Sequence, residues 1–269
     1  MGLHRLQREN KMKAAERQLR IRQMFESKDF LDLETLCREL DASESSVRRD
    51  LDVLEEQSVL KRVYGGAVPS QPPGNGTFDY TVERGRLSDE KHRIARLAAS
   101  LIKDGETVIL DGGSTVAAVA QELAEKSELS ARSLHIITNS LPIAEVLESR
   151  RNIELTLTGG YLDSRRRVML GPLCEQMLSL IRADVLVMGI GSVSETGFSN
   201  NNTLVVGSEQ KMIEIASKVV IVADHTKFGR GAMIPVAQLE AADIVVSDSE
   251  LAPEFVELLR GKGIEVLLA

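Results

Sequence analysis

The chain has 269 residues, of which 43% are hydrophobic and 27% are charged. This balance is typical of an ordinary globular protein and leaves enough chain for a substantial core. The longest apolar runs, such as Val219 to Ala223, are much too short to cross a bilayer, and the N-terminus lacks the apolar segment of a signal peptide. We therefore expect a cytoplasmic protein with no membrane partner.

The net charge of −7 is unevenly distributed. Of the 33 Lys and Arg residues and the 40 Asp and Glu residues, thirteen of each lie in residues 1–68, so residues 69–269 carry the whole negative charge. Residues 1–25 hold seven basic and two acidic residues. A neutral module with clustered cations joined to an acidic body is compatible with DNA binding but does not establish it.

The two cysteines, Cys37 and Cys174, lie far apart, each within an apolar pattern. We expect two buried thiols, because free cysteine is usually buried. Their spacing offers neither a zinc site nor a disulfide framework. We predict no metal and no cofactor.

The N-terminal part predicts three helices in quick succession. Residues 1–15 are polar and basic, and a solvated tail is a simpler explanation for them than an arm lying on phosphates. A helix follows at residues 16–25. Asp32 can cap a second helix, in which Leu33, Leu36, Cys37 and Leu40 form one apolar stripe.

Ser43 begins the third helix as a plausible N-cap. Val47, Leu51 and Leu54 recur at helical spacing and should be buried, whereas the opposite face carries Ser45, Arg48, Arg49 and Asp52. Leu60 to Tyr64 then predicts a strand, and Gly65-Gly66 a turn. This is the order of a winged helix-turn-helix domain, with the third helix in the major groove of DNA.

The run from Ser43 to Ala67, SESSVRRDLDVLEEQSVLKRVYGGA, resembles the signature of the DeoR family of bacterial transcription regulators. That family pattern has a Ser-Glu-x-Thr start, an Arg-Arg-Asp-Leu recognition helix and a Leu-x-Arg-x-x-Gly-Gly-Ala wing. Ser46, Ser58 and Tyr64 stand where the family favours Thr, Gly and His, and none of these changes removes the arginines. The DNA-binding residues implied are Ser45, Ser46, Arg48, Arg49, Lys61, Arg62, Tyr64, Gly65 and Gly66.

Residues 70–88 form the expected linker, because PSQPPGNGTFDY is rich in Pro, Gly and small polar residues and Thr81 to Ser88 continues the connection. From Asp89 the pattern alternates. Strands are predicted at Thr107–Leu110, Leu134–Ile137, Ile153–Leu157, Val185–Met188, Val219–Ala223, Ile244–Val246 and Glu265–Leu268, and helices at Val116–Lys126, Leu141–Arg150, Leu170–Leu180, Glu209–Ser217 and Ala252–Arg260. Short buried strands alternating with helices indicate an α/β fold with a mainly parallel sheet covered on both faces.

Polar loops follow the ends of these strands. Asp111-Gly112-Gly113-Ser114-Thr115 follows the first, and similar loops begin at Thr138, Gly159, Gly189 and Asp224. Ligands of open α/β sheets bind at the carboxyl ends of strands. Glycines let backbone N–H groups approach an anion, and a helix N-terminus adds donors. The loops therefore predict a phosphate or sugar-phosphate site.

This part also resembles the DeoR C-terminal sensor domain between about Asp89 and Arg230, through the runs DGGST, ITNS, LTGG, MGIGS and ADHTKFGR. The resemblance implies a fold similar to phosphosugar isomerases and a phosphorylated sugar or related metabolite as effector. The effector-binding residues implied are Asp111, Gly112, Gly113, Ser114, Thr115, Asn139, Lys211, Asp224 and Lys227. The stretch Ser199–Lys211 departs from the family, which commonly places an acid earlier than Glu209. Arg165, Arg166 and Arg167 could attract a phosphate or DNA, but an exposed charged loop is the simpler explanation.

We predict four regions: a basic extension (1–15), a winged helix-turn-helix domain (16–69), a linker (70–88) and an isomerase-like effector domain (89–269). The predicted function is a transcriptional regulator, a repressor of sugar or carbon metabolism genes, that acts as a homo-oligomer on a double-stranded DNA operator. The alternatives are a phosphosugar isomerase with an appended DNA-binding domain and a purely architectural DNA binder. An enzyme is disfavoured, since no pair with catalytic spacing stands out among Asp111, Asp224, His225 and Lys227.

Overall fold

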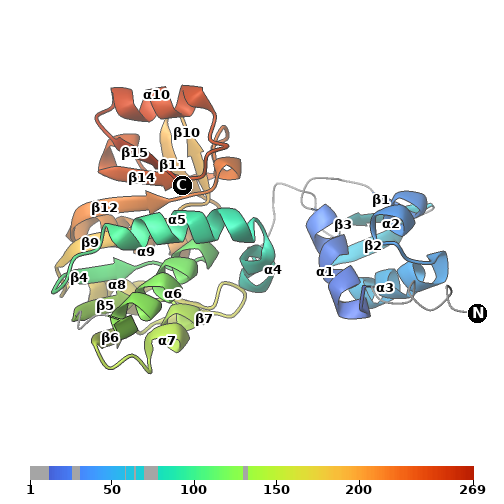
Figure 1. Ribbon diagram of the computed structural model, residues 1–269, viewed down its shortest axis with the longest axis horizontal. Helices are drawn as coiled ribbons and strands as arrows, with labels where there is room; N and C mark the ends of the chain where they lie inside the picture. Colours follow the sequence, from blue (N-terminus) through green and yellow to red (C-terminus); the bar gives the residue numbers. More distant parts are fainter. Residues whose placement is uncertain (1–11, 26–30, 58, 64, 70–77, 130–132) are drawn as a thin grey trace, which may run out of the picture. The chain divides into compact units, whose positions relative to one another are not determined.

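The computed structural model of the protein describes residues 12–25, 31–57, 59–63, 65–69, 78–129 and 133–269. The chain divides into two compact units, Met1–Phe78 and Asp79–Ala269. Figure 1 labels their helices and strands.

The N-terminal unit is a winged helix-turn-helix domain, as predicted. Its elements are α1 (Ala14–Met24), β1 (Leu31–Asp32), α2 (Leu33–Glu39), α3 (Glu44–Glu56), β2 (Leu60–Val63) and β3 (Gly66–Pro69). The strands form an antiparallel sheet in the order β1-β3-β2. The two-residue strand β1 is an addition to the predicted hairpin, and it pairs Leu31 with Ala67.

The apolar stripes of α2 and α3 build the core of this unit. Val47, Leu51 and Leu54 of α3 are at most 1% exposed, and they belong to one cluster with Leu36 and Ile21. The N-cap of α2 is the predicted one, since Asp32 Oδ1 accepts a hydrogen bond from the Thr35 N–H at 2.7 Å. The prediction of two buried thiols is wrong for Cys37, which is partly exposed, whereas Cys174 is buried.

Asp50 is a structural residue in the Arg-Arg-Asp run. It lies on the core side of α3 and is 2% exposed. Its carboxylate accepts hydrogen bonds from Arg17 Nε at 2.7 Å and from Gln18 Nε2 at 3.2 Å. A buried carboxylate needs such partners, so this pair ties α1 to α3.

The C-terminal unit is built on a seven-stranded sheet. Its strands are β4 (Thr107–Leu110), β5 (Leu134–Thr138), β6 (Ile153–Leu157), β9 (Ala183–Gly189), β12 (Ala216–Val222), β14 (Ile244–Ser247) and β15 (Glu265–Leu268), in the order β15-β14-β12-β9-β4-β5-β6. Every neighbouring pair is parallel. These are the seven runs predicted from the sequence, since strands buried on both faces show as continuous apolar runs.

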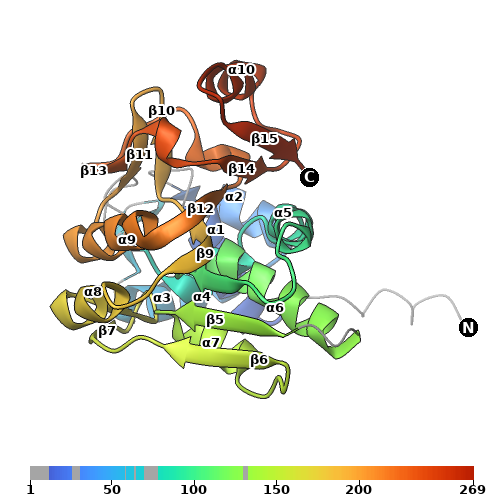
Figure 2. The same ribbon diagram turned by 90° about the vertical axis from the view of Figure 1, so that its left-hand side faces the viewer.

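Helices cover both faces of this sheet. Besides a six-residue helix at Tyr80–Gly85, the helices of the unit that contact the sheet or one another are α5 (Ser88–Ser100), α6 (Ser114–Leu129), α7 (Leu141–Leu147), α8 (Pro172–Leu178), α9 (Thr203–Ile215) and α10 (Pro253–Gly261). Figure 2 shows α8 and α9 on one side of the sheet, with α5 and α6 on the other. The layered α/β fold is therefore confirmed. In the described part of the chain, no helix has the length and apolar character needed to span a membrane.

Residues expected to continue the linker form a helix instead. α4 (Tyr80–Gly85) begins at the N-cap Asp79, whose Oδ1 accepts a hydrogen bond from the Thr81 N–H at 2.9 Å. The sequence did not predict this helix, because it follows a Pro- and Gly-rich stretch directly and has no apolar stripe of its own.

Small antiparallel elements were also not predicted. They are β7 (Tyr161–Asp163) with β8 (Val168–Leu170), and β10 (Ser192–Ser194) with β11 (Gly197–Asn200) and β13 (Ile234–Ala237). These strands contain polar residues or Pro, or span only three residues, so they lack the longer apolar run that marks a buried strand. α9 also begins six residues before its predicted start, because the Asn202 side chain caps it through the N–H groups of Leu204 and Val205.

Candidate functional site

The outer face of α3 presents the side chains expected to reach DNA. Ser45, Arg48 and Arg49 are exposed, and Ser46 is half-buried. Arg48 pairs with Glu44 one turn earlier, with Nη2 2.6 Å from Oε1. An exposed pair of this kind contributes only a few tenths of a kcal/mol. Arg48 can therefore exchange Glu44 for a phosphate or a guanine edge at little cost.

Arg62 anchors the wing, which is the β2–β3 hairpin, to α3. Its backbone N–H donates to Glu55 Oε1 at 2.8 Å, and its guanidinium pairs with Asp52. Lys61 is exposed on the same strand. The turn requires both glycines: Gly65 has φ +82°, and a Cβ on Gly66 would lie 2.2 Å from the Leu31 carbonyl oxygen. Tyr64, also predicted to contact DNA, lies outside the described residues.

In the C-terminal unit the structure brings Asp111 and Asn139 together at the ends of neighbouring strands, β4 and β5. Both are buried, with exposed fractions of 5% and 1%. Asn139 and the Gly112 N–H donate hydrogen bonds to the Asp111 carboxylate. Gly112 admits no side chain, since a Cβ there would lie 2.3 Å from Val168 Cγ1. The predicted loop is thus a close-packed polar site.

Glu209 completes this cluster and was missed from the sequence. It is 2% exposed on α9, and Asn200 Nδ2 donates to its Oε1 at 2.9 Å. Burial raises the pKa of Asp111 to about 7. Burial and the nearby Asp111 raise the pKa of Glu209 well above its ordinary value. Two acids placed so close together therefore favour a protonated state.

Two acceptor atoms in this cluster lack hydrogen-bond partners among the described residues. They are Asn139 Oδ1 and Glu209 Oε2, and both are inaccessible to solvent. Buried polar atoms are nearly always paired in folded proteins. These two oxygens are therefore available to a donor that enters the site.

The positive charge of Arg166 acts on Glu209 and partly offsets the rise in the pKa of that carboxyl group. Its side chain is 13% exposed and pairs with Asp163 at 3.2 Å within the β7–β8 hairpin. The prediction of an exposed charged loop is wrong for Arg166, because the hairpin turns it inward. Arg165 is exposed, and Arg167 pairs with Glu145 at 2.6 Å.

A cleft of about 170 Å³ lies between α4, α5 and α6, and Ser114 and Lys91 both line it. Ser114 is the first residue of α6, where N–H groups and the helix dipole favour an anion. Lys91 is 3% exposed, and its Nζ donates to the Glu83 carbonyl oxygen at 2.5 Å. Burial lowers the pKa of Lys91, while Glu83 and Asp224 oppose that shift. Lys91 was also missed, because a lysine on an amphipathic helix usually faces water.

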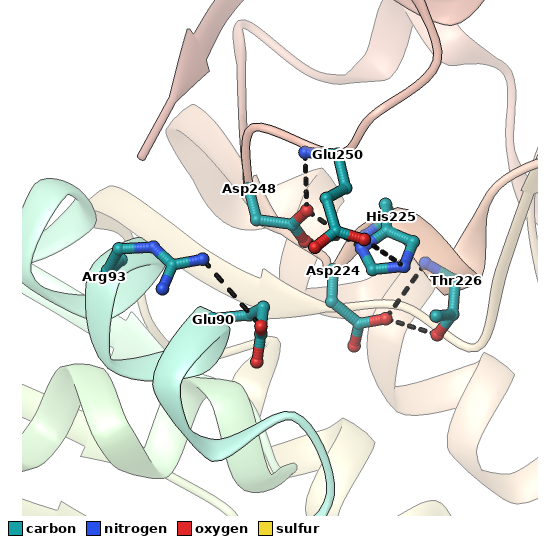
Figure 3. Close-up of polar contacts among 7 residues, drawn as sticks. All are labelled: Glu90, Arg93, Asp224, His225, Thr226, Asp248 and Glu250. Atoms are coloured by element: carbon teal, nitrogen blue, oxygen red, sulfur yellow. Dashed lines mark hydrogen bonds and ion pairs between the residues drawn. The ribbon is translucent and has the colours of Figure 1, made fainter.

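The loop after β12 is held by carboxylates, as Figure 3 shows. Asp224 accepts a hydrogen bond from the Thr226 N–H at 3.1 Å and is 2% exposed. Asp248 accepts from the His225 N–H at 2.8 Å, and its other oxygen lies 2.8 Å from His225 Nδ1. His225 Nε2 lies 3.5 Å from Glu250. These contacts fix the loop and assign His225 a structural role.

The remaining predicted cations lie in two places. Lys227 Nζ lies 3.5 Å from Glu83 Oε2, and Lys227 also affects Lys91 electrostatically, so it lies beside the cleft. Lys211 pairs with Glu214 at 2.5 Å. Because Lys211 follows Glu209 by two helical positions, it points to the opposite side of α9 from the buried cluster. Thus Asp111, Asn139, Ser114, Asp224 and Lys227 gather at one edge of the sheet, but Lys211 does not join them.

Comparisons with known proteins match both units. Residues 17–72 match the model of the DeoR-like helix-turn-helix domain, and residues 87–249 match that of the DeoR C terminal sensor domain. The chain is 34% identical to the HTH-type transcriptional repressor GlcR of Bacillus subtilis, over 94% of this chain and 95% of that protein. It is 30% identical to the Glycerol-3-phosphate regulon repressor of Escherichia coli, over 96% and 100% of the two chains.

Among solved structures, the chain is similar to ribose 5-phosphate isomerase a from Methanocaldococcus jannaschii, with 21% identity and a TM-score of 0.41. The match covers 53% of this chain and 55% of the isomerase, so it spans about half the length of either. The curated relatives are transcriptional regulators, which confirms the prediction of a regulator over an enzyme. The chain belongs to the DeoR family of DNA-binding transcriptional regulators, and it joins a helix-turn-helix domain to a sensor domain for a small molecule.

Proposed function

We propose that the protein is a repressor of sugar or carbon metabolism genes whose operator binding is controlled by a phosphorylated sugar or polyol. The observation that carries this proposal is the cleft that Ser114 and Lys91 both line, at the N-terminus of a sixteen-residue helix. It lies at the strand-end edge that also holds the buried Asp111 cluster. An anion site beside a set of hydroxyl acceptors matches the two chemical parts of a sugar phosphate.

The phosphate is assigned to the cleft. The Ser114 hydroxyl and the N–H groups of the first turn of α6 supply donors, and the Lys91 ammonium supplies charge. Gly113 has φ +126°, and no heavy atom of the described residues lies within 4 Å of the position that a Cβ would take, so the loop backbone can approach a ligand there. Thr115, which is 8% exposed, belongs to the same turn.

The hydroxyls are assigned to the buried cluster. The free acceptors Asn139 Oδ1 and Glu209 Oε2 would each take a hydrogen bond from a ligand hydroxyl. Asp111 can accept or donate according to its proton, because its pKa lies near neutrality. A non-phosphorylated sugar would occupy the buried cluster but not the cleft. Strong binding therefore requires a ligand that carries both hydroxyls and a phosphate.

The DNA-binding unit is proposed to act as part of a homo-oligomer on repeated half-sites in the operator. Ser45, Ser46, Arg48 and Arg49 would enter the major groove, with Lys61, Arg62, Tyr64 and the Gly65-Gly66 turn on the backbone. The effector would shift the oligomer between arrangements of different operator affinity, which requires different effector affinity in the two. The protein would act in the cytoplasm.

The test is a thermal and chemical stability screen against glycerol 3-phosphate and a panel of sugar phosphates, each beside its unphosphorylated parent. A ligand at about 100 times its Kd should stabilise the chain by about 2.7 kcal/mol. Ser114→Ala and Lys91→Met should abolish that gain, and Lys262→Met should retain it, since Lys262 pairs with Glu240 outside the cleft. A positive ligand is then tested on operator affinity at fixed salt. Equal stabilisation by phosphorylated and parent compounds would contradict the proposal.

A further inference from the structure

Glu83 on α4 is surrounded by positive charge. Its carboxylate lies 3.5 Å from Lys227 Nζ, 4.0 Å from Lys91 Nζ and 3.7 Å from Arg86 Nη1. Its own side chain is 16% exposed. Three cations around one carboxylate form an anion site, and in this structure a side chain of the protein occupies it.

The cations that hold Glu83 are those next to the effector cleft. Lys91 lines the cleft with Ser114, and Lys227 lies three residues after the N-cap Asp224 on the loop after β12. Lys91 also donates to the Glu83 backbone carbonyl. Glu83 therefore binds the same ammonium group that a ligand phosphate would need.

α4 is the first helix of the C-terminal unit, directly after the residues that join it to the DNA-binding unit. Within its own unit it packs against α6, and its first residue, Tyr80, is buried. The Tyr80 N–H donates to the Arg165 carbonyl oxygen at 2.9 Å, and the Glu83 contacts secure its last turn. Leu87, between α4 and α5, has the left-handed φ of 46°, a conformation that a non-glycine residue adopts at a cost. The last turn of the short helix is therefore the part that the Glu83 contacts hold.

We propose that Glu83 is a tethered anion that competes with the phosphate of the effector for Lys91 and Lys227, so that effector binding releases the last turn of α4. This inference rests on the phosphate site proposed above, and it assigns to α4 the transmission of effector binding to the DNA-binding unit. A phosphate dianion carries more charge and more acceptor oxygens than a carboxylate, so it takes the shared cations when it enters. Linkage then requires that whatever strengthens the Glu83 contacts weakens phosphate binding, and the reverse.

The experiment uses the full chain and inorganic phosphate as the probe, titrated by calorimetry at constant ionic strength and pH. Glu83→Gln removes the competing charge and keeps the shape, so its phosphate affinity should rise roughly threefold or more. The matched control is Glu240→Gln, which neutralises a carboxylate 2.6 Å from Lys262 outside the cleft and should leave the affinity unchanged.

A second measurement uses the unaltered chain. Hydrogen exchange of the Glu83 and Arg86 amides, which are bonded to the carbonyls of Asp79 and Glu83, should accelerate when phosphate is added. The same amides should exchange fast in Glu83→Gln without phosphate. Exchange in α10 is the internal reference and should not change.

The outcomes separate the inference from the proposed function. Absence of phosphate binding by every variant would overturn the tethered anion, whereas the proposed function is decided by the stability screen with phosphorylated sugars. Phosphate binding that needs Lys91 and Ser114, with equal affinity in Glu83→Gln and no change in α4 exchange, would leave the phosphate site standing and overturn the tethered anion. Weaker binding by Glu83→Gln would also overturn it, since Glu83 would then support the lysines.

Discussion

Replacing Asp111 by Asn should stabilise the protein at alkaline pH much more than in acid. Burial raises the pKa of Asp111 from its ordinary 3.8 to about 7, so the folded chain keeps a proton there that the unfolded chain releases. The favourable contribution of this group is complete below pH 3.8 and is lost as the pH rises to about 7. Asparagine is similar in size and does not ionise, so it escapes the loss.

The magnitude follows from the same pKa. At about 1.4 kcal/mol for each pH unit, the cost of Asp111 reaches about 2 kcal/mol at pH 5 and about 4 kcal/mol at pH 8. Hydrogen bonding to the Gly112 N–H persists in Asp111→Asn, because the amide oxygen still accepts. Glu209 also loses the neighbour that raises its pKa, which adds to the gain.

The assay is urea unfolding of the two proteins by circular dichroism at pH 5 and pH 8, with the transition of the C-terminal unit compared. Asp89→Asn is the matched control: Asp89 is exposed in the first turn of α5, and its replacement should shift stability by only a few tenths of a kcal/mol at either pH. A gain of the same size at both pH values, or a loss at pH 8, would refute the reasoning.

Three further predictions concern other parts of the chain. Asp50→Ala should destabilise the N-terminal unit by about 2 to 4 kcal/mol in urea unfolding, because it strands the half-buried Arg17, whereas Asp52→Ala on the exposed face should cost under about 1 kcal/mol. Arg49→Ala should weaken operator binding and lower the slope of log affinity against log salt by about one, with an unchanged melting temperature; an unchanged slope would remove Arg49 from the DNA contacts. Burial raises the pKa of Asp248, but hydrogen bonds from the N–H groups of His225 and Glu250 and from the His225 ring outweigh it, so the pKa lies below its ordinary value. The stabilising contribution of Asp248 is therefore present above pH 3.8 and lost as the pH falls further. Asp248→Asn should therefore destabilise the protein at pH 7 and converge with the parent near pH 3, and a pH-independent loss would show that packing alone is at work.

The fold of the C-terminal unit was predictable because a buried parallel strand needs apolar residues on both faces. Runs such as Val219–Ala223 have no other ready explanation in a chain of alternating pattern. α4 was not predictable in the same way. It spans six residues, and two of the residues that it contacts, Arg165 and Lys227, lie far away in the sequence.

The residues of the candidate site also fall into a group that local sequence could predict and a group that it could not. Asp111, Ser114 and Asn139 follow strand ends directly, so local sequence places them at the edge where ligands bind. Glu209, Lys91 and Glu83 reach that edge from helices, and which helical face turns inward is decided by packing against other elements. A polar residue on a helix is usually solvated, so the sequence carried no signal that Glu209 is buried against Asp111.

The cost of the Asp111 cluster bears on how a sensor can work. A ligand shifts an equilibrium only by its difference in affinity between two states. Asn139 Oδ1 and Glu209 Oε2 lack partners in the part of the chain that the structure describes, and the carboxyl groups of Asp111 and Glu209 lie near each other, so this arrangement carries an unfavourable energy without a ligand. On the proposed function, a sugar phosphate relieves that cost only in the conformation that assembles the cluster. Substitutions that remove this unfavourable energy without a ligand, such as Asp111→Asn, should then increase stability and weaken the response to the effector together.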